Sequence, residues 1–162
     1  MIAANWAPGL RRRSFGLEHH VRIDNSWRER FAALRAEADG AILRERAQVV
    51  CGSDIDFSAV SAAQQAAQEC GLKLRFSRRD VLNLAPPAAT GTIVTNPPYG
   101  IRLEGGESLV RRMGQSFSRF AGHEVIVLSP DATWRTALGA PPKREHTLFN
   151  GDIECRAYGW SL

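Results

Sequence analysis

The chain has 162 residues, of which 44% are hydrophobic and 23% are charged, and these values are ordinary for one globular domain with a real core. No apolar run approaches the length of a membrane span, and the three cysteines lack the spacing of a metal site, so the composition predicts a cytoplasmic protein without a structural metal. The net charge of +4 permits a nucleic-acid partner but does not require one.

The first part of the chain is predicted to hold an irregular segment followed by one helix. Residues 1–25 contain a Pro-Gly breaker and no regular hydrophobic period. Ser26, with Glu29 three positions later, forms a capping box that predicts a helix running to about Arg46. The arginine run at 11–13 is either solvated surface, the more frequent case, or a contact for a polyanion.

The rest of the chain alternates between strands and helices. Short apolar runs bounded by turn residues predict strands, and longer periodic runs predict helices. Strands are predicted at 48–53, 73–77, 91–95, 124–129, 144–148 and 153–160, and helices at 57–70, 108–120 and 132–138. Asn150-Gly151 is a hairpin signal between the last two strands. This order predicts an α/β fold with a doubly wound, mostly parallel sheet and a C-terminal antiparallel hairpin, in a single domain whose core spans 26–162.

The most informative motif is Asn96-Pro97-Pro98-Tyr99, which directly follows a predicted strand. Two successive prolines allow neither a helix nor continued strand pairing, so the chain leaves the sheet in an extended conformation. An amide, a carbonyl oxygen and an aromatic ring then lie at the carboxyl edge of the sheet, where open α/β folds bind ligands. Two acceptors beside a stacking ring suit a planar group with an exocyclic amine, such as a nucleobase. The alternative is a rigid turn in which Tyr99 covers the core.

Acidic residues end the two preceding strands. Asp54 and Asp56 close the first, and Asp80 follows the second. Asp56 precedes a helix and is explained as its N-cap, whereas Asp54 is favoured as the partner of a ribose hydroxyl pair. Asp80 is a candidate acceptor for an adenine amine or an ordinary turn residue. Ile55 is expected either on an adenine face or in the core.

This ordered set of strand ends resembles the Rossmann-like amino-methyltransferases that use S-adenosylmethionine and carry an Asn-Pro-Pro-Tyr motif. By that resemblance Asn96 and the Pro97 carbonyl hold the target amine, and Tyr99 stacks on the flipped base. The resemblance also implies a cofactor site in which Asp54 holds the ribose, Asp80 holds the adenine, and Ile55 and Asn96 take part.

Three further segments look like the bacterial ribosomal-RNA guanine-N2 methyltransferases, and the similarity covers almost the whole chain. They are Ala-Ala-Asn-Trp-Ala-Pro-Gly-Leu at 3–10, Gly-Ser-Asp-Ile-Asp at 52–56 and Leu-Phe-Asn-Gly-Asp-Ile-Glu-Cys-Arg at 148–156. This resemblance implies methyl transfer from S-adenosylmethionine to guanine N2 of ribosomal RNA, with RNA favoured over DNA as the partner.

The resemblance has a gap at the front of the chain. Such enzymes begin with an RNA-docking THUMP domain, followed by a central strand that ends in a glycine-rich cofactor loop, and no such loop precedes Asp54. We therefore expect a partial methyltransferase domain without its first central strand, with weak or lost cofactor affinity on its own. Two strand edges would then be free for self-association or for a partner chain.

Two rival functions stay open at this point. The first is an adenine-N6 DNA methyltransferase, because the Asn-Pro-Pro-Tyr motif serves adenine as well as guanine. The second is a non-catalytic domain that binds RNA or a partner subunit, which the missing glycine-rich loop favours.

Overall fold

The computed structural model describes residues 4–12, 14–20, 24–98 and 106–162 of the chain. The chain divides into two compact units, Met1–Arg78 and Arg79–Leu162, and each is described by itself. The expectation of a single domain stays a prediction. Within the described ranges, none of the helices is long and apolar enough to cross a membrane.

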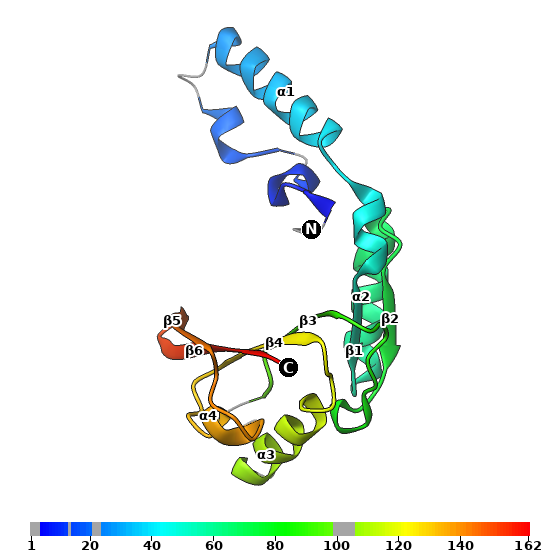
Figure 1. The fold of residues 1–162 in the computed structure, drawn as a ribbon. Helices are drawn as coiled ribbons and strands as arrows, with labels where there is room; N and C mark the ends of the chain where they lie inside the picture. The colour runs from blue at the N-terminus through cyan, green and yellow to red at the C-terminus, as the bar shows by residue number, and fades with distance from the viewer. Residues whose placement is uncertain (1–3, 13, 21–23, 99–105) are drawn as a thin grey trace. The chain divides into compact units, whose positions relative to one another are not determined.

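The first unit combines helices with a small parallel sheet (Figure 1). Its elements in chain order are η2 (Pro8–Arg11), η3 (Gly16–His19), α1 (Asn25–Gly40), η4 (Arg44–Val49), β1 (Cys51–Asp54), α2 (Phe57–Glu69) and β2 (Arg75–Arg78), where η marks a 3-10 helix. Strands β1 and β2 pair in parallel, with Cys51 opposite Arg75, and α2 packs against both. The buried residues Ala4, Cys70 and Leu72 form one cluster in this unit, and Val60 and Ala67 of α2 are buried as well.

Helix α1 is shorter than predicted and has a different cap. Asp24 is its N-cap, because Oδ1 accepts a hydrogen bond from the backbone N–H of Trp27 at 2.9 Å. Ser26 lies in the first turn and donates its hydroxyl to Asp24 at 2.8 Å, so the predicted cap is wrong by two positions. The helix ends at Gly40, a poor helix former, and not at Arg46.

Helix α2 begins and ends at the residues that the sequence indicates. Asp56 is its N-cap and accepts from the backbone N–H of Ser58 at 2.8 Å. Gly71 has a φ of +64°, a left-handed conformation that suits glycine at the end of a helix. The strand predicted at 48–53 begins only at Cys51, because the preceding residues form η4.

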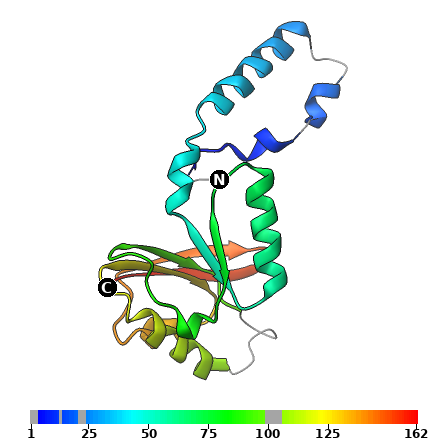
Figure 2. The same cartoon turned by 90° about the vertical axis from the view of Figure 1, so that its right-hand side faces the viewer.

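The second unit is built on a four-stranded sheet in the order β3-β4-β6-β5 (Figure 2). Its elements are η5 (Val81–Asn83), β3 (Gly91–Thr95), α3 (Gly106–Phe117), β4 (His123–Ser129), α4 (Trp134–Ala137), β5 (Arg144–Asn150) and β6 (Ile153–Ser161). Strands β3 and β4 are parallel, whereas β6 is antiparallel to both β4 and β5. Gly151 has a φ of +62° in the turn between the last two strands, so the predicted hairpin is confirmed. The α/β fold class, with parallel strands and a C-terminal antiparallel hairpin, is confirmed as well.

A continuous core joins the helices of the second unit to one face of its sheet. The buried side chains come from α3, α4 and the two central strands, β4 and β6. They are Val110, Met113, Phe117, Val125, Val127, Trp134, Ala137, Leu138, Tyr158 and Trp160. Strand β4 alternates buried and half-buried residues along its length, as a strand covered mainly on one face does.

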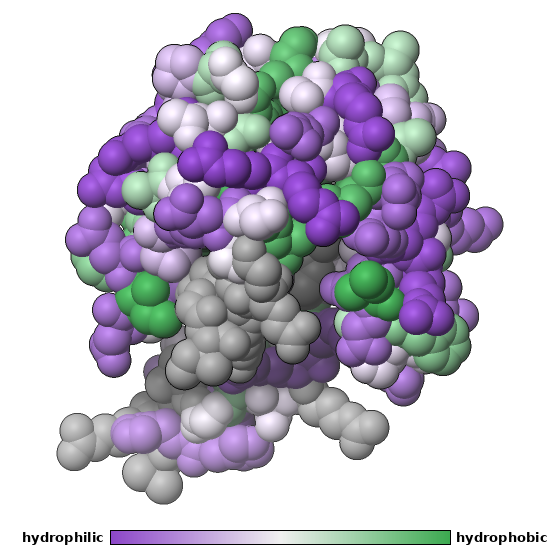
Figure 3. Space-filling view, turned by 90° about the horizontal axis from the view of Figure 1, so that it is seen from below, coloured by the Kyte–Doolittle hydropathy of each residue, from purple (hydrophilic) through white to green (hydrophobic). Residues whose placement is uncertain are grey.

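Each sheet has an outer strand with a free edge in the described part of the chain. There β1 pairs with β2 alone, and β3 pairs with β4 alone. Val94 on β3 is 73% exposed, which is unusual for a β-branched residue in a strand of an α/β sheet. Elsewhere, on the face seen in Figure 3, hydrophobic residues form separate groups among hydrophilic ones. The expectation that another chain pairs with these edges stays a prediction.

Candidate functional site

The Asn-Pro-Pro segment leaves the sheet directly after β3, as the sequence indicates. Pro97 is buried, whereas Asn96 and Pro98 are exposed. No hydrogen bond joins the Asn96 side chain to another described residue. Tyr99, the fourth residue of the motif, lies outside the described residues. The buried proline ring anchors the segment, and the amide that precedes it keeps its donors and acceptor available for a ligand.

Asp80 lies two residues beyond β2 and has a structural partner. Its Oδ1 accepts from the backbone N–H of Leu82 at 2.9 Å and caps η5. Helix α3 and the turn after it hold η5 in place, because the Ser116 hydroxyl donates to the Val81 carbonyl at 2.7 Å and Arg119 donates to the Leu82 carbonyl at 2.8 Å. Asp80 therefore acts as a turn residue, which is one of the two interpretations that the sequence allows. A carboxylate also has a second oxygen that can accept from a ligand amine.

Asp54 is the last residue of β1, and its side chain is exposed. Oδ1 of Asp54 accepts from the backbone N–H of Asp56 at 2.9 Å, which fixes the carboxylate at the strand end. Asp56 itself is the helix cap that the sequence indicates. The Ser58 hydroxyl donates to Asp56 Oδ2 at 2.7 Å, and this bond, with the Ser58 amide, lowers the pKa of Asp56 below its ordinary value. Asp54 is thus the carboxylate at this end of β1 that does not cap a helix.

Apolar side chains surround this strand end without burying it. Ile55 is 62% exposed and Phe57 is 67% exposed, so Ile55 does not lie in the core of the first unit. Arg78 Nε donates to the Ile55 carbonyl at 2.9 Å and so positions the loop after β1. Neither Arg78 nor Phe57 was predicted as a site residue from the sequence. Both residues come after predicted strands, near the carboxyl ends, and that position could have identified them.

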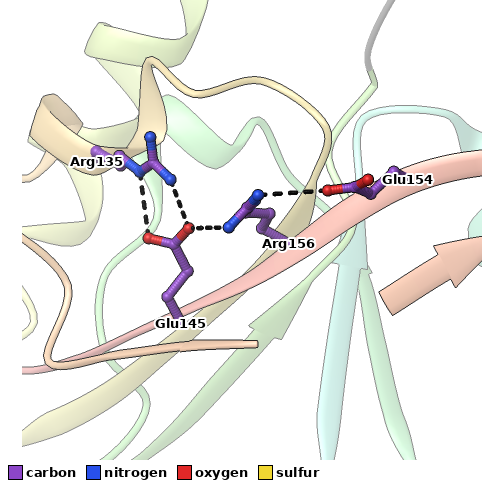
Figure 4. A network of polar contacts seen from close by, with 4 residues as sticks. All are labelled: Arg135, Glu145, Glu154 and Arg156. Atoms are coloured by element: carbon purple, nitrogen blue, oxygen red, sulfur yellow. Dashed lines mark hydrogen bonds and ion pairs between the residues drawn. The ribbon is translucent and has the colours of Figure 1, made fainter. Parts of the chain in front are cut away.

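An ion-pair network joins α4, β5 and β6 of the second unit (Figure 4). Glu145 Oε1 accepts from Arg135 Nη2 at 2.6 Å and from Arg156 Nη1 at 2.8 Å, and Arg156 also contacts Glu154 at 3.3 Å. The hydrogen bond from Arg135 is the main reason why the pKa of Glu145 lies below its ordinary value.

The strand register places Arg156 of this network at the same end of the sheet as Asn96. Thr95 pairs with Val127, and Ser129, two residues further along β4, pairs with Arg156. The network was not predicted from the sequence, because its members come from three elements and form no motif.

The predicted site residues fall into both units. Asp54 and Ile55 belong to the first unit, and Asp80 and Asn96 belong to the second. Asp54 is the last residue of β1, Asp80 comes two residues after β2, and Asn96 comes directly after β3, so each lies at the carboxyl end of a parallel strand, as predicted. In the first unit the exposed Asp54 carboxylate and the exposed Ile55 side chain suit hydroxyl donors and a planar ring, and in the second unit the exposed Asn96 amide suits an amine donor.

This chain is similar to curated proteins that are about four times its length. The chain is 36% identical to the "Ribosomal RNA large subunit methyltransferase K/L" of Shewanella oneidensis and 35% identical to the protein of the same name from Shewanella baltica. Each match covers 96% of this chain and 23% of the relative. The chain thus spans about a quarter of the length of these relatives.

Solved structures share the fold over nearly the whole chain. SMU.472, whose crystal structure holds SAH, has a TM-score of 0.86 and 26% identity, and the match covers 99% of this chain and 43% of that one. A protein from Listeria monocytogenes described as a "predicted N6-adenine-specific DNA methylase" has a TM-score of 0.82 and 28% identity, with 99% and 42% covered. The profile of the family "RMKL-like, methyltransferase domain" matches residues 1–158. The chain therefore belongs to the RMKL-like methyltransferase domain family.

Proposed function

We propose that this chain takes part in methyl transfer from S-adenosylmethionine to an exocyclic amine of a nucleobase, namely guanine N2 of ribosomal RNA, in the cytoplasm. The observation that carries the proposal is Asn96, whose amide is exposed and unpaired among the described residues directly after a parallel strand. Family membership and the names of the curated relatives support the reaction and the RNA substrate.

The Asn-Pro-Pro segment would hold the amine. The Asn96 side-chain oxygen and the Pro97 carbonyl would each accept one N–H of the base amine, which turns the nitrogen lone pair towards the methyl group. The buried Pro97 ring limits movement of this acceptor pair, so the orientation is set before the substrate arrives. The proton that the amine loses leaves to solvent.

The strand ends also fit the adenosine part of S-adenosylmethionine. Asp54 offers an exposed carboxylate to a hydroxyl pair, Ile55 offers an exposed apolar surface to a ring, and Asp80 offers an acceptor to an amine. The bound cofactor supplies an activated methyl group on a sulfonium. The SAH in the structure of SMU.472 supports this choice of cofactor.

Methylation of adenine N6 in DNA is the second candidate, favoured by the description of the Listeria relative. Both bases present an exocyclic amine, so Asn96 and Pro97 serve either one. The names of the curated relatives favour RNA over DNA. Methylation assays with a large-subunit ribosomal RNA transcript and with duplex DNA separate the two candidates.

Asn96→Ala tests the proposal. We expect methyl transfer to the ribosomal RNA transcript to fall about 100-fold or more, because the variant loses an acceptor that orients the reacting nitrogen. Calorimetric titration with S-adenosylhomocysteine should give the same Kd as the unaltered chain. Asn83→Ala, which removes another exposed amide of the second unit, is the matched control and should retain activity. Full activity in Asn96→Ala would remove Asn96 from the mechanism, and a chain that binds no cofactor and transfers no methyl group would contradict the proposed function.

A further inference from the structure

Helix α1 carries an aromatic stripe that the described residues do not bury. None of its sixteen residues is buried. Trp27, Phe31 and Leu34 recur at helical spacing, and with Arg30 they line a shallow hollow on one side of the helix. The rings of Trp27 and Phe31 stack nearly parallel, with centroids 5.0 Å apart and an angle of 10°. Leu34 is 54% exposed, so the stripe presents apolar surface to solvent.

Arginines lie around these rings. The Arg35 guanidinium lies 5.9 Å from the Phe31 ring centroid and 5.9 Å from that of Phe15. Arg12 lies 5.7 Å from the Phe15 ring. The Arg12 carbonyl accepts from Arg35 Nη2 at 3.0 Å, which ties the segment before the helix to α1. The arginine–aromatic surface, as we call it, consists of Arg12, Trp27, Arg30, Phe31, Leu34 and Arg35.

Carboxylates do not neutralise this surface. Within the described part of the first unit, Arg11 and Glu69 form the recorded ion pair, and neither belongs to the surface. Two of the nearby acidic residues have other partners, since Glu18 accepts from the backbone N–H of Phe15 at 2.7 Å and Asp24 caps α1, and in the described part of the chain the α1 residues Glu29, Glu37 and Asp39 form no ion pair with the surface. The guanidinium groups of the surface therefore keep their charge available to an anionic partner.

Half-buried rings among arginines that form no ion pair with a described carboxylate have the chemistry of a single-stranded nucleic-acid surface. Guanidinium groups bind phosphates, and unstacked bases stack on aromatic side chains and on arginine planes. A protein partner for the apolar stripe would require carboxylates opposite the arginines, whereas RNA supplies both the negative charge and the planar rings. We propose that the arginine–aromatic surface binds single-stranded RNA, through phosphate contacts at Arg12 and Arg30 and base stacking at Trp27. As an account of how the substrate is held, this inference rests on the proposed function.

Binding of a fluorescein-labelled 20-nucleotide single-stranded RNA, followed by fluorescence anisotropy across a salt series, tests the inference. Arg30→Ala should weaken binding and reduce the salt slope by about 0.7, the value for one phosphate contact on a single strand. Trp27→Ala should weaken binding by about 5- to 100-fold, the range for one stacked base, and leave the salt slope unchanged. Trp27→Phe keeps a ring and should recover most of that loss.

The control is Arg75→Ala, which removes an exposed arginine from β2 of the same unit and should bind RNA as the unaltered chain does. Circular dichroism should show equal helix content in all variants, because the Trp27 side chain does not take part in the helix cap. Equal RNA affinity in Arg30→Ala, Trp27→Ala and the unaltered chain would overturn the inference. A change of oligomeric state with unchanged RNA affinity would also overturn it, because the surface would then bind protein.

Asn96→Ala separates this inference from the proposed function. That variant should lose methyl transfer and keep its affinity for the labelled RNA, because Asn96 lies outside the surface. If the chain transfers no methyl group while Trp27→Ala still weakens RNA binding, the proposed function fails and the RNA surface stands. If methyl transfer proceeds and neither Trp27→Ala nor Arg30→Ala changes the affinity for RNA, the inference about the surface is wrong and the proposed function stands.

Discussion

Polar side chains at the strand ends differ in how free they are to bind a ligand, because some of them already accept hydrogen bonds within the protein. Asp56 and Asp80 accept from backbone N–H groups of the turns that follow them, so part of their role is local folding. Asn96 has no described partner, and Asp54 orders the strand end while its side chain stays exposed. The position of a residue after a strand is therefore not sufficient to identify a ligand-binding group. Of these four side chains, Asn96 is the one without a described partner, while Asp54 and Asp80 each keep a second carboxylate oxygen for a ligand.

Asp54→Asn is the informative change at the cofactor site. The amide oxygen of the substituted side chain would still accept from the Asp56 N–H, so we expect the strand end to keep its shape. The two hydrogen bonds to a ribose hydroxyl pair would become neutral, and each would then contribute about 0.5–1.5 kcal/mol where a charged acceptor contributes about 1.5–3 kcal/mol. The Kd for S-adenosylhomocysteine, measured by calorimetry, should rise about 10- to 100-fold. Asp152→Asn, an exposed change in the hairpin turn, should leave it unaltered. An unchanged Kd in Asp54→Asn would remove Asp54 from the cofactor site.

At the scale of elements, the contact between α3 and α4 depends on a glycine. A Cβ on Gly114 would lie 2.2 Å from the carbonyl oxygen of Ala137, which is backbone and does not move aside as a side chain does. Close approach at this point lets Phe117 stack against Trp134 with ring centroids 6.3 Å apart. The two helices then cover the face of the sheet that carries Tyr158.

Gly114→Ala should separate the two helices and destabilise the second unit by about 1–3 kcal/mol, the usual effect of overpacking. Thermal denaturation followed by circular dichroism measures the effect. Gly40→Ala is the control, because nothing lies within 4 Å of the Cβ that it adds. Equal melting temperatures for the two variants would contradict this prediction, because the α3–α4 contact would then have room for the added methyl group.

Elements with strong local signals were predicted from the sequence more closely than those that depend on neighbours. Asp56 and Gly71 bound α2, and Asn150-Gly151 makes the hairpin, because each acts within a few residues. Helix α1 was predicted with the wrong cap, since Asp24 and Ser26 are both good caps and the Ser-x-x-Glu pattern favoured the second. The ion-pair network around Glu145 could not be predicted, because it depends on the register of β5 on β6 and on the position of α4.

For the molecule as a whole, the two units differ in how much apolar surface they bury. The second unit has a ten-residue buried cluster that spans helices and sheet. The first has a cluster of three small or medium-sized buried residues, and β1 carries no buried residue. Because burial of apolar surface is the main stabilising contribution to folding, the first unit should open at lower free energy. The proposed cofactor residue Asp54 and the arginine–aromatic surface both lie in this less stable unit.

Native-state hydrogen exchange tests this difference. Amide protons of β1 and β2 should exchange faster than those of β4 and β6, because local opening of the first unit exposes its two-stranded sheet while the second sheet stays intact. Added S-adenosylhomocysteine should slow exchange at the carboxyl end of β1 if Asp54 holds the ribose, since a ligand stabilises the state that binds it. Asp54→Asn should lose this protection and keep the exchange pattern of β4 and β6. Equal exchange rates in the two sheets would mean that the chain opens as one cooperative body, and the stability of the Asp54 strand end would then depend on the core of the second unit.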